Sequence, residues 1–222
     1  MKKLILLPCL DGTGLLFQPL LEQLGDCPTQ VITYPTHTNL SLEQLTQHVM
    51  QQAVFDQNTV LLAESFSGLV ALALLREGIE LHSIIFCASF ASAPRPYLLK
   101  LANYLPLEIL FKLPLPALAL KTFLKPPLIK IIQQVHQRVS PAVLAYRLRL
   151  IANARMELEQ TPWAIPCYYL QAANDWAVPT RCINELKQYF IRFEVITIND
   201  SGHFLLQTQP KLCAKHIRNI CV

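Results

Sequence analysis

The order of apolar segments along the chain predicts an α/β fold, in which a mostly parallel sheet is covered by helices on both faces. Six short runs rich in Leu, Ile and Val alternate with segments of helical periodicity. Each run is apolar along most of its length, as expected of strands that are buried on both faces. Strands that alternate with helices are typical of parallel sheets. The predicted strands are residues 3–8, 29–35, 58–64, 82–90, 166–173 and 192–198.

Helical spacing of apolar residues fills the intervals between these runs. Ser41 is a good N-cap for the second helix, and Gly25 and Gly78 stand where the first and third helices end. The predicted helices are residues 15–25, 41–54, 67–78, 179–190 and 207–221.

The segment 94–160 interrupts this alternation. It is rich in Leu, Pro and Lys, contains no convincing strand, and is divided by the stretches "LPLP" and "KPP". We therefore predict a helical cap, or lid, at 94–160, inserted into an α/β core formed by 1–93 and 161–222.

Composition limits the class of protein. The chain has 222 residues, of which 52% are hydrophobic and 15% charged, so a folded domain with a full core is expected. No apolar run reaches the roughly 18 residues of a membrane span. The start "MKKLILLPCL" is interpreted as the first strand and not as a signal peptide, because Pro8 and Asp11 interrupt it.

Cysteine and histidine usage predicts a cytoplasmic protein without a metal site. The seven cysteines are scattered and form no C-x-x-C pair, which favours reduced thiols. The six histidines include no H-E-x-x-H pattern. We expect neither a metal nor a cofactor.

Positive charge is concentrated in the predicted cap. Between Arg95 and Arg155, ten basic residues and one acid, Glu108, give a net charge of +9, against +4 for the whole chain. It is interpreted either as a docking surface for an acidic acyl carrier protein or an anionic lipid surface, or as the charge that keeps a Leu-rich cap soluble. Nucleic acid is a poorer candidate, since aromatics are few among these charges. The ten residues are Arg95, Lys100, Lys112, Lys121, Lys125, Lys130, Arg138, Arg147, Arg149 and Arg155.

The stretch "LLAESFSGLVAL" places Ser65 between a predicted strand and a predicted helix. A sharp strand-to-helix turn exposes a nucleophilic serine when small residues flank it at positions −2 and +2. Ala63 and Ser67 occupy these positions, where glycine is usual. Alone, this pattern is also compatible with a serine that caps a helix.

Two further loops follow predicted strands. Asp175 lies in "QAANDWAVP" and His203 in "NDSGHFLLQTQP". Individually, the aspartate could belong to a turn and the histidine to the surface. The carboxyl ends of parallel strands meet at one edge of a sheet, however, and the chain order Ser, Asp, His is that of an α/β-hydrolase triad.

A catalytic serine of this kind needs two N–H donors for the oxyanion. One would be the Phe66 N–H, directly after the serine. The other would come from the loop after the first strand, "LLPCLDGTG", where position favours the Leu10 N–H. The glycines of this loop do not extend to G-x-G-x-x-G, so a nucleotide site is not expected.

Over essentially its whole length the sequence resembles the α/β-hydrolase superfamily, through "LLPCLDGTG", "AESFSG", "NDWAVP" and "SGHFLLQTQP". It is most similar to small bacterial carboxylesterases with a helical lid, including pimeloyl-[acyl-carrier-protein] methyl ester esterases. The resemblance implies Ser65 as nucleophile, His203 as general base and acid, and Asp175 as its orienter. Ala63, Ser67 and Cys9 depart from glycines common in the family, and its usual N-terminal antiparallel strands are absent.

The predicted function is therefore that of a serine esterase acting on small aliphatic acyl esters. We expect apolar cap residues to line the acyl site, among them Leu98, Leu105, Leu110, Phe111, Leu118 and Phe123. Two alternatives remain: an esterase or thioesterase for carrier-linked acyl groups, and a non-catalytic binding protein of hydrolase fold. A dehalogenase is disfavoured, because the elbow residue is serine and not aspartate.

Overall fold

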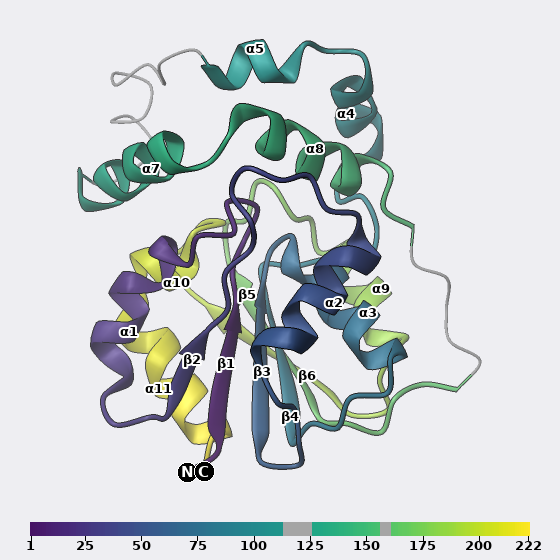
Figure 1. Cartoon of the computed structure of the whole chain (residues 1–222). Helices are drawn as coiled ribbons and strands as arrows, with labels where there is room; N and C mark the ends of the chain where they lie inside the picture. The colour runs from purple at the N-terminus through teal and green to yellow at the C-terminus, as the bar shows by residue number, and fades with distance from the viewer. Residues whose placement is uncertain (113–125, 156–160) are drawn as a thin grey trace.

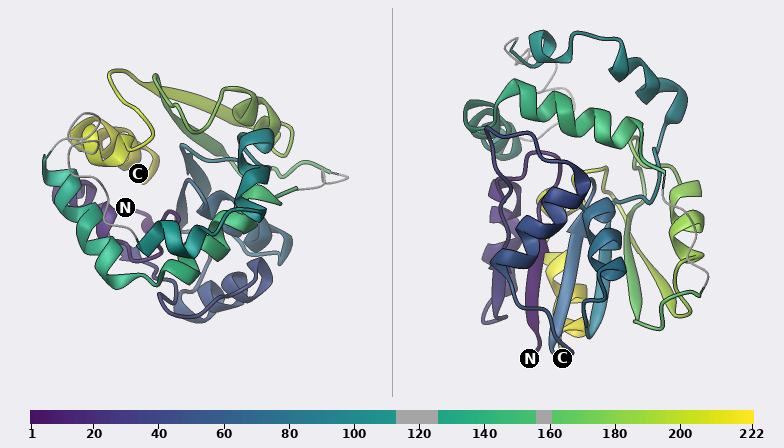
Figure 2. Two further views of the ribbon diagram at one scale, coloured as in Figure 1. Left: turned by 90° about the horizontal axis from the view of Figure 1, so that it is seen from above. Right: turned by 45° about the vertical axis from the view of Figure 1, so that its right-hand side comes forward.

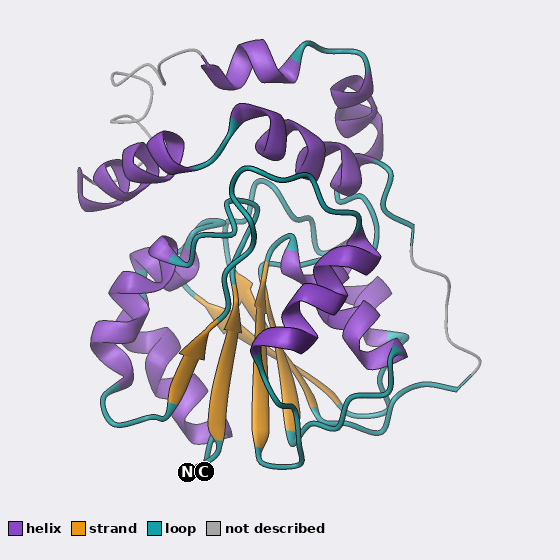
Figure 3. Cartoon of the chain, in the orientation of Figure 1, coloured by secondary structure: helices purple, strands orange, loops and turns teal. Residues whose placement is uncertain are grey.

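The computed structural model describes residues 1–112, 126–155 and 161–222. All six described strands are parallel and form one sheet of order β2-β1-β3-β4-β5-β6 (Figures 1 and 3). The prediction of an α/β fold with a mostly parallel sheet is thus confirmed. The strands are β1 (Lys3–Leu7), β2 (Thr29–Val31), β3 (Thr59–Glu64), β4 (Ser83–Cys87), β5 (Cys167–Ala172) and β6 (Phe193–Ile198).

Helices cover both faces of this sheet. One face carries α1 and α11, and the other carries α2, α3 and α9 (Figure 1). Along β1, Ile5 and Leu7 pack into the hydrophobic cluster on the face of α2, α3 and α9. Leu4 and Leu6 pack into the cluster on the face of α1 and α11. Because successive strand residues point to opposite faces, a wholly apolar strand supplies both. The helices are α1 (Gln18–Leu24), α2 (Leu42–Gln52), α3 (Ser67–Arg76), α9 (Arg181–Lys187), α10 (Leu205–Thr208) and α11 (Pro210–Ile220), with the 3-10 helix η1 (Leu15–Phe17).

Several predicted boundaries differ from the structure. The strand predicted at 82–90 ends at Cys87, because Ala88 has a left-handed φ of 44°. The strand predicted at 29–35 ends at Val31. The single helix predicted at 207–221 is two helices, α10 and α11, which separate at Gln209 because the residue before a proline disfavours helical geometry.

In the described part of the chain, four further helices lie over the carboxyl ends of the strands (Figures 1 and 2). We call them, with the 3-10 helix η2 (Leu101–Asn103), the cap. Helix α8 lies nearest the sheet, and its residue Ile151 packs against the core cluster of α2 and α3. The assignment of 94–160 as a separate domain stays a prediction. The cap helices are α4 (Pro96–Lys100), α5 (Leu107–Lys112), α7 (Pro126–Arg138) and α8 (Pro141–Ala152).

Candidate active site

Ser65 occupies a strained turn directly after β3. Its φ is 51°, a left-handed conformation that costs a non-glycine residue on the order of 1–3 kcal/mol. Two hydrogen bonds hold the turn: the Ser65 N–H donates to the Cys87 carbonyl at 2.9 Å, and the Ser89 hydroxyl donates to the Ser65 carbonyl at 2.6 Å. The turn therefore projects the Ser65 side chain from the end of the strand, as the sequence predicts for an elbow.

The residues that replace the usual elbow glycines have different roles. Ala63 is a fully buried residue of β3, paired with Leu7 of β1. Ser67 is also buried, and its hydroxyl donates to the Pro8 carbonyl and lies 2.6 Å from the Tyr34 hydroxyl. Ser67 thus connects the elbow to the loop after β1, a contact that glycine could not make.

The close packing associated with an elbow glycine occurs at Gly68 instead. A Cβ added to Gly68 would stand 1.9 Å from the Ser89 Oγ and 3.0 Å from the Phe90 carbonyl oxygen. Ser89 is the residue that holds the Ser65 carbonyl, so it has little freedom to withdraw. Glycine at 68 lets α3 start against this loop, a requirement that the sequence motif does not reveal.

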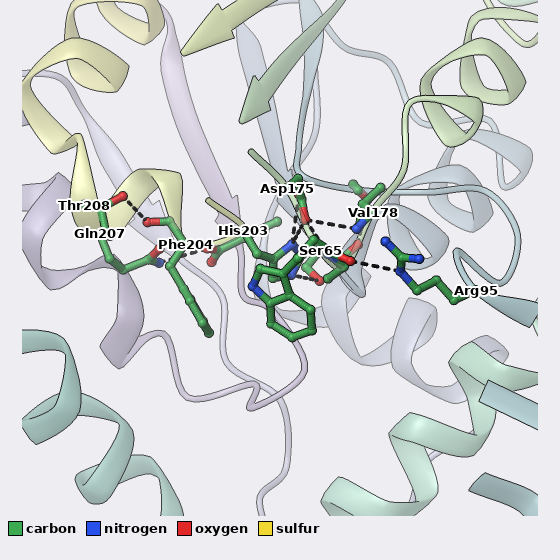
Figure 4. A network of polar contacts seen from close by, with 12 residues as sticks. Ser65, Arg95, Asp175, Val178, His203, Phe204, Gln207 and Thr208 are labelled. Carbon is green, nitrogen blue, oxygen red and sulfur yellow. Dashed lines mark hydrogen bonds and ion pairs between the residues drawn. The ribbon is translucent and has the colours of Figure 1, made fainter. Parts of the chain in front are cut away.

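His203 lies between Ser65 and Asp175 (Figure 4). The Ser65 Oγ is 3.1 Å from His203 Nε2, and His203 Nδ1 is 3.0 Å from Asp175 Oδ2. Asp175 follows β5 and His203 follows β6, so adjacent strands deliver both side chains to the same edge. The structure brings together the three residues that the sequence singled out. With the Nδ1 proton donated to Asp175, Nε2 is free to accept the hydroxyl proton of Ser65.

Backbone donors fix the Asp175 carboxylate. Its Oδ1 accepts the Ala177 N–H at 2.8 Å and the Val178 N–H at 2.9 Å. Asp175 is therefore held as an acceptor for the imidazole and cannot rotate away without losing both bonds.

The two expected oxyanion donors follow neighbouring strands, Leu10 after β1 and Phe66 after β3. Leu10 lines the cavity above Ser65, and Phe66 directly follows Ser65. Within the described residues, neither N–H has a hydrogen-bond acceptor. Next to Leu10, the Cys9 thiol donates to Asp11 Oδ1 at 3.1 Å. Burial and the nearby Asp11 raise the pKa of the Cys9 thiol well above its ordinary value, so this cysteine is not a competing nucleophile.

Glu64, which the sequence analysis did not single out, is buried directly before the nucleophile. Its Oε1 accepts a 2.8 Å hydrogen bond from Gln207 of α10, whereas its Oε2 is buried without a partner in the described chain. Burial raises the pKa of Glu64 to about 7, although the Gln207 bond opposes the shift. The sequence feature that could have indicated Glu64 is a charged residue at the end of an otherwise apolar strand.

A cavity of about 570 Å³ opens above Ser65 and His203. The predicted Leu98 and Phe111 line it, whereas Leu105 and Leu110 are exposed elsewhere; residues 118 and 123 lie outside the described chain. Most of the cap lining comes from α7 and α8, which the sequence analysis did not foresee. Those residues are Ile132, Val135, His136, Leu144, Leu148 and Ile151.

The positive segment is not one continuous surface. Arg147 is buried, which corrects its assignment to a docking surface, and Arg149 is half-buried. The guanidinium of Arg147 donates to main-chain carbonyls of the core and is therefore withdrawn from solvent. Residues 121 and 125 lie outside the described chain. The basic residues that are exposed are Arg95, Lys100, Lys112, Lys130, Arg138 and Arg155.

The described residues have neither a metal-binding cluster nor a membrane-spanning helix. They contain no cluster of three or more His, Cys, Asp or Glu side chains that could hold a metal ion. No helix among them is long and apolar enough to cross a membrane. All seven cysteines are free thiols.

No protein-family model matches the sequence, and no curated protein is similar to it in sequence. Solved structures, by contrast, match along nearly the whole chain. The thioesterase RedJ of the prodiginine pathway of Streptomyces coelicolor is 18% identical, with a TM-score of 0.72 over 98% of this chain and 85% of that one. An esterase from Thermogutta terrifontis is 18% identical, with a TM-score of 0.71 over 99% and 89%.

An enol-lactonase from Burkholderia xenovorans is 16% identical, with a TM-score of 0.74 over 99% of this chain and 90% of that one. At these identities the likeness establishes the fold and not the reaction. Six parallel strands in the observed order and these structural neighbours agree with the resemblance found in the sequence: the chain has the α/β-hydrolase fold.

Proposed function

We propose that this protein is a serine hydrolase that cleaves carboxylic esters of aliphatic acyl groups. The observation that carries the proposal is the continuous contact from Ser65 Oγ through His203 to Asp175, at 3.1 and 3.0 Å, at the floor of an apolar cavity. The contact supplies an activated nucleophile, and the cavity supplies a site for an acyl chain.

The reaction follows from these positions. His203 Nε2 takes the Ser65 proton as Oγ attacks the ester carbonyl carbon, while Asp175 stabilises the resulting imidazolium. The Leu10 and Phe66 N–H groups stabilise the oxyanion. The tetrahedral intermediate collapses as His203 protonates the leaving alcohol, which leaves an acyl group on Ser65. Water, deprotonated by His203, then attacks the acyl-enzyme carbonyl. The second tetrahedral intermediate collapses as His203 returns the proton to Ser65 Oγ, and the acid is released. Each step uses only side chains and N–H groups of this chain.

The shape and chemistry of the cavity favour an aliphatic acyl group. Leu98, Phe111 and Leu148 line it, and most of its other lining side chains are also apolar. Burying a chain of methylene groups there contributes roughly 0.8 kcal/mol per group. Since all seven thiols are free, we further propose that the enzyme works in a reducing compartment such as the cytoplasm.

A second candidate is the hydrolysis of carrier-linked acyl esters or thioesters, including the pimeloyl methyl ester. Two observations favour it. Several structural neighbours are named thioesterases, and six exposed basic residues lie on the cap helices or close to them in the chain. A thioester is attacked by the same serine through the same intermediate, so the two candidates differ in the leaving group and the docking surface.

The decisive experiment combines fluorophosphonate labelling with a panel of p-nitrophenyl esters from acetate to laurate. We expect the wild type to be labelled once and to prefer chains longer than acetate. Ser65→Ala abolishes both labelling and turnover, whereas Ser140→Ala, a half-buried serine at the start of α8, leaves both unchanged. A Ser65→Ala protein as active as the parent would identify a non-catalytic binding protein and end the proposal.

A further inference from the structure

Arg147 is a buried cation for which the described residues supply no salt-bridge partner. It lies in the middle of α8, its side chain is 2% exposed, and among the described residues no carboxylate forms an ion pair with it. Burial lowers the pKa of its guanidinium below the ordinary value. A charge that is buried without a counter-ion is costly, and Leu or Met could fill the same space more cheaply. The contacts of Arg147 therefore need an explanation other than packing.

The guanidinium donates to three main-chain carbonyls of the core. Nη1 reaches the Leu10 oxygen at 3.0 Å and the Asp11 oxygen at 2.8 Å, and Nη2 reaches the Pro35 oxygen at 2.8 Å. Hydrogen bonds from a cation are stronger than those between neutral groups. Two of the three hold the loop that carries the expected Leu10 oxyanion donor.

Gly12 leaves the space that this contact needs. A Cβ added there would stand 2.5 Å from Arg147 Nη1 and 2.8 Å from the Tyr34 Cβ, and the φ of Gly12 is 73°. A side chain at position 12 would displace the guanidinium from the loop. Gly12 and Arg147, which are 135 positions apart in the sequence, thus depend on each other for this contact.

Every carbonyl of the loop from Pro8 to Gly12 has a donor. The C=O and N–H of one trans peptide point in opposite directions, so holding a carbonyl also sets the direction of the N–H of the next residue. Arg147 holds the Asp11 carbonyl, whose peptide contains the Gly12 N–H, and this N–H holds the Cys9 carbonyl, whose peptide contains the Leu10 N–H. Arg147 is therefore linked to the Leu10 N–H through the hydrogen bond from Gly12 to Cys9. If Arg147 is removed, the Leu10 and Asp11 carbonyls lose their donor and can turn. The acceptor and donor pairs are Pro8 with Ser67 Oγ, Cys9 with Gly12 N at 3.1 Å, Leu10 and Asp11 with Arg147, and Gly12 with Tyr34 N at 2.8 Å.

The same group is linked to the nucleophile elbow. The Arg147 guanidinium carbon lies 5.5 Å from the centre of the Tyr34 ring, and the Tyr34 hydroxyl is 2.6 Å from Ser67 Oγ at the start of α3. A cation over an aromatic face is attracted by the ring. Arg147 is thereby connected to both segments that supply the expected oxyanion donors, the Leu10 loop and the Phe66 turn.

We propose that Arg147 is a positioning residue: from the cap it holds the Leu10–Asp11 loop so that the Leu10 N–H faces the oxyanion formed at Ser65. This inference rests on the proposed function. It makes the cap part of the catalytic geometry, and it predicts that loss of Arg147 lowers kcat while the KM for an acyl ester changes little, because the acyl cavity stays intact.

The test uses Arg147→Ala, with Arg149→Ala on the same helix as the control. Arg149 is half-buried, and among the described residues its side chain has one hydrogen bond, from Nε to the Ala102 carbonyl at 3.4 Å, and none to the loop. We expect Arg147→Ala to lower kcat about 10- to 100-fold, as for a misplaced transition-state donor, with KM within threefold. Arg149→Ala retains wild-type kcat.

Chemical rescue distinguishes positioning from general damage to the fold. Methylguanidinium at about 20 mM should restore kcat of Arg147→Ala at least fivefold, and should restore neither Ser65→Ala nor Arg149→Ala. A trifluoromethyl ketone, which mimics the tetrahedral intermediate, should lose affinity in proportion to kcat/KM. If Arg147→Ala does not fold, Arg147→Lys carries the same test, since it keeps the charge but supplies one nitrogen in place of the fork, and a kcat at least fivefold below wild type is expected.

The inference and the proposed function fail in different ways. If the wild type is neither labelled by fluorophosphonate nor active on any ester, the proposed function is wrong. If the wild type is active and a folded Arg147→Ala or Arg147→Lys has the same kcat, only the role of Arg147 is wrong. A loss of kcat that methylguanidinium does not restore, with unchanged affinity for the ketone, also overturns it.

Discussion

The end of the sheet at which Ser65 lies, which we call the sheet edge, and the cap differ in how many of their residues are buried. Eight of the ten residues of α3, the helix that follows Ser65, are buried, whereas α4 buries none and α5 buries only Leu107. On the cap, Tyr97 is 88% and Tyr104 87% exposed. The nucleophile thus directly precedes a closely packed helix, whereas part of the cavity wall sits on loosely packed ones.

This difference teaches a division of roles. Positions that must be accurate to a fraction of an ångström belong to rigid elements, whereas residues that select a substrate can vary on elements with little packing to lose. Helices α7 and α8 differ from α4 and α5 within the cap: α7 buries Leu128, Ile129, Ile131 and Val135, and α8 has six buried residues including Arg147. We therefore expect changes at the sheet edge to alter the rate with every substrate, and changes in α4 and α5 to alter the order of preference among substrates.

The largest expected effect is that of Asp175→Asn. The amide cannot stabilise the imidazolium and favours the wrong tautomer of His203, so kcat should fall about 10³- to 10⁴-fold on short and long esters alike. Steady-state kinetics with acetate and octanoate esters measure this loss. Asp200→Asn, an exposed aspartate after β6, serves as the control and should retain full activity. Unequal losses on the two esters would contradict the division of roles.

A change in the cap should act on selectivity. Leu98→Trp places a larger ring at the cavity, so the ratio of kcat/KM for octanoate over butyrate should fall about tenfold, while the butyrate value changes less than twofold. Leu110→Trp, on an exposed cap leucine outside the cavity lining, is the matched control. If both variants lower activity on both esters equally, the proposed role of the cap in selectivity is contradicted.

Charge reversal of the exposed cap residues tests the carrier-linked candidate. Lys100→Glu, Lys112→Glu and Arg155→Glu together should lower kcat/KM for a carrier-bound acyl thioester about five- to tenfold, because they repel an acidic partner. The small p-nitrophenyl ester should be spared. Lys211→Glu with Lys215→Glu, exposed on α11 away from the cap, should leave both substrates unaffected. Equal losses on both substrates would argue against docking.

The smallest expected effect concerns stability at the sheet edge. The pKa of Glu64 rises from 4.5 to about 7 on folding, so this carboxyl group disfavours the folded state progressively as pH rises from about 4.5 to 7. Glu64→Gln cannot ionise, and its Tm should exceed that of the wild type by several degrees at pH 8 but by less at pH 5. Thermal unfolding at both pH values measures the difference.

Glu43 provides the matched control for that measurement. It is an exposed glutamate on α2 whose pKa is lowered by hydrogen bonds from a backbone N–H and from Ser41. Glu43→Gln should therefore not raise the Tm at pH 8. If Glu64→Gln shows the same pH dependence as Glu43→Gln, Glu64 is not the titrating group.

Most of the sheet edge was predictable because its signals are local. Apolar runs located the strands, and Ser65, Asp175 and His203 each followed one of them, so the topology of a parallel sheet was enough to expect them together. The cap lining was predicted only at Leu98 and Phe111. A leucine-rich amphipathic segment does not reveal which of its faces meets the core, since that depends on how the helices pack.

The sequence by itself determined the order of strands and helices, the sheet edge at which the site forms, and the three residues expected to react, since periodicity and turn residues are properties of neighbouring positions. Only the tertiary structure decided that Ser67 bonds to the Pro8 carbonyl, that Gly68 accommodates Ser89, and that Arg147 turns inward to the Leu10 loop. These contacts join segments up to 137 positions apart, and strand register and helix packing create them, which no local pattern encodes.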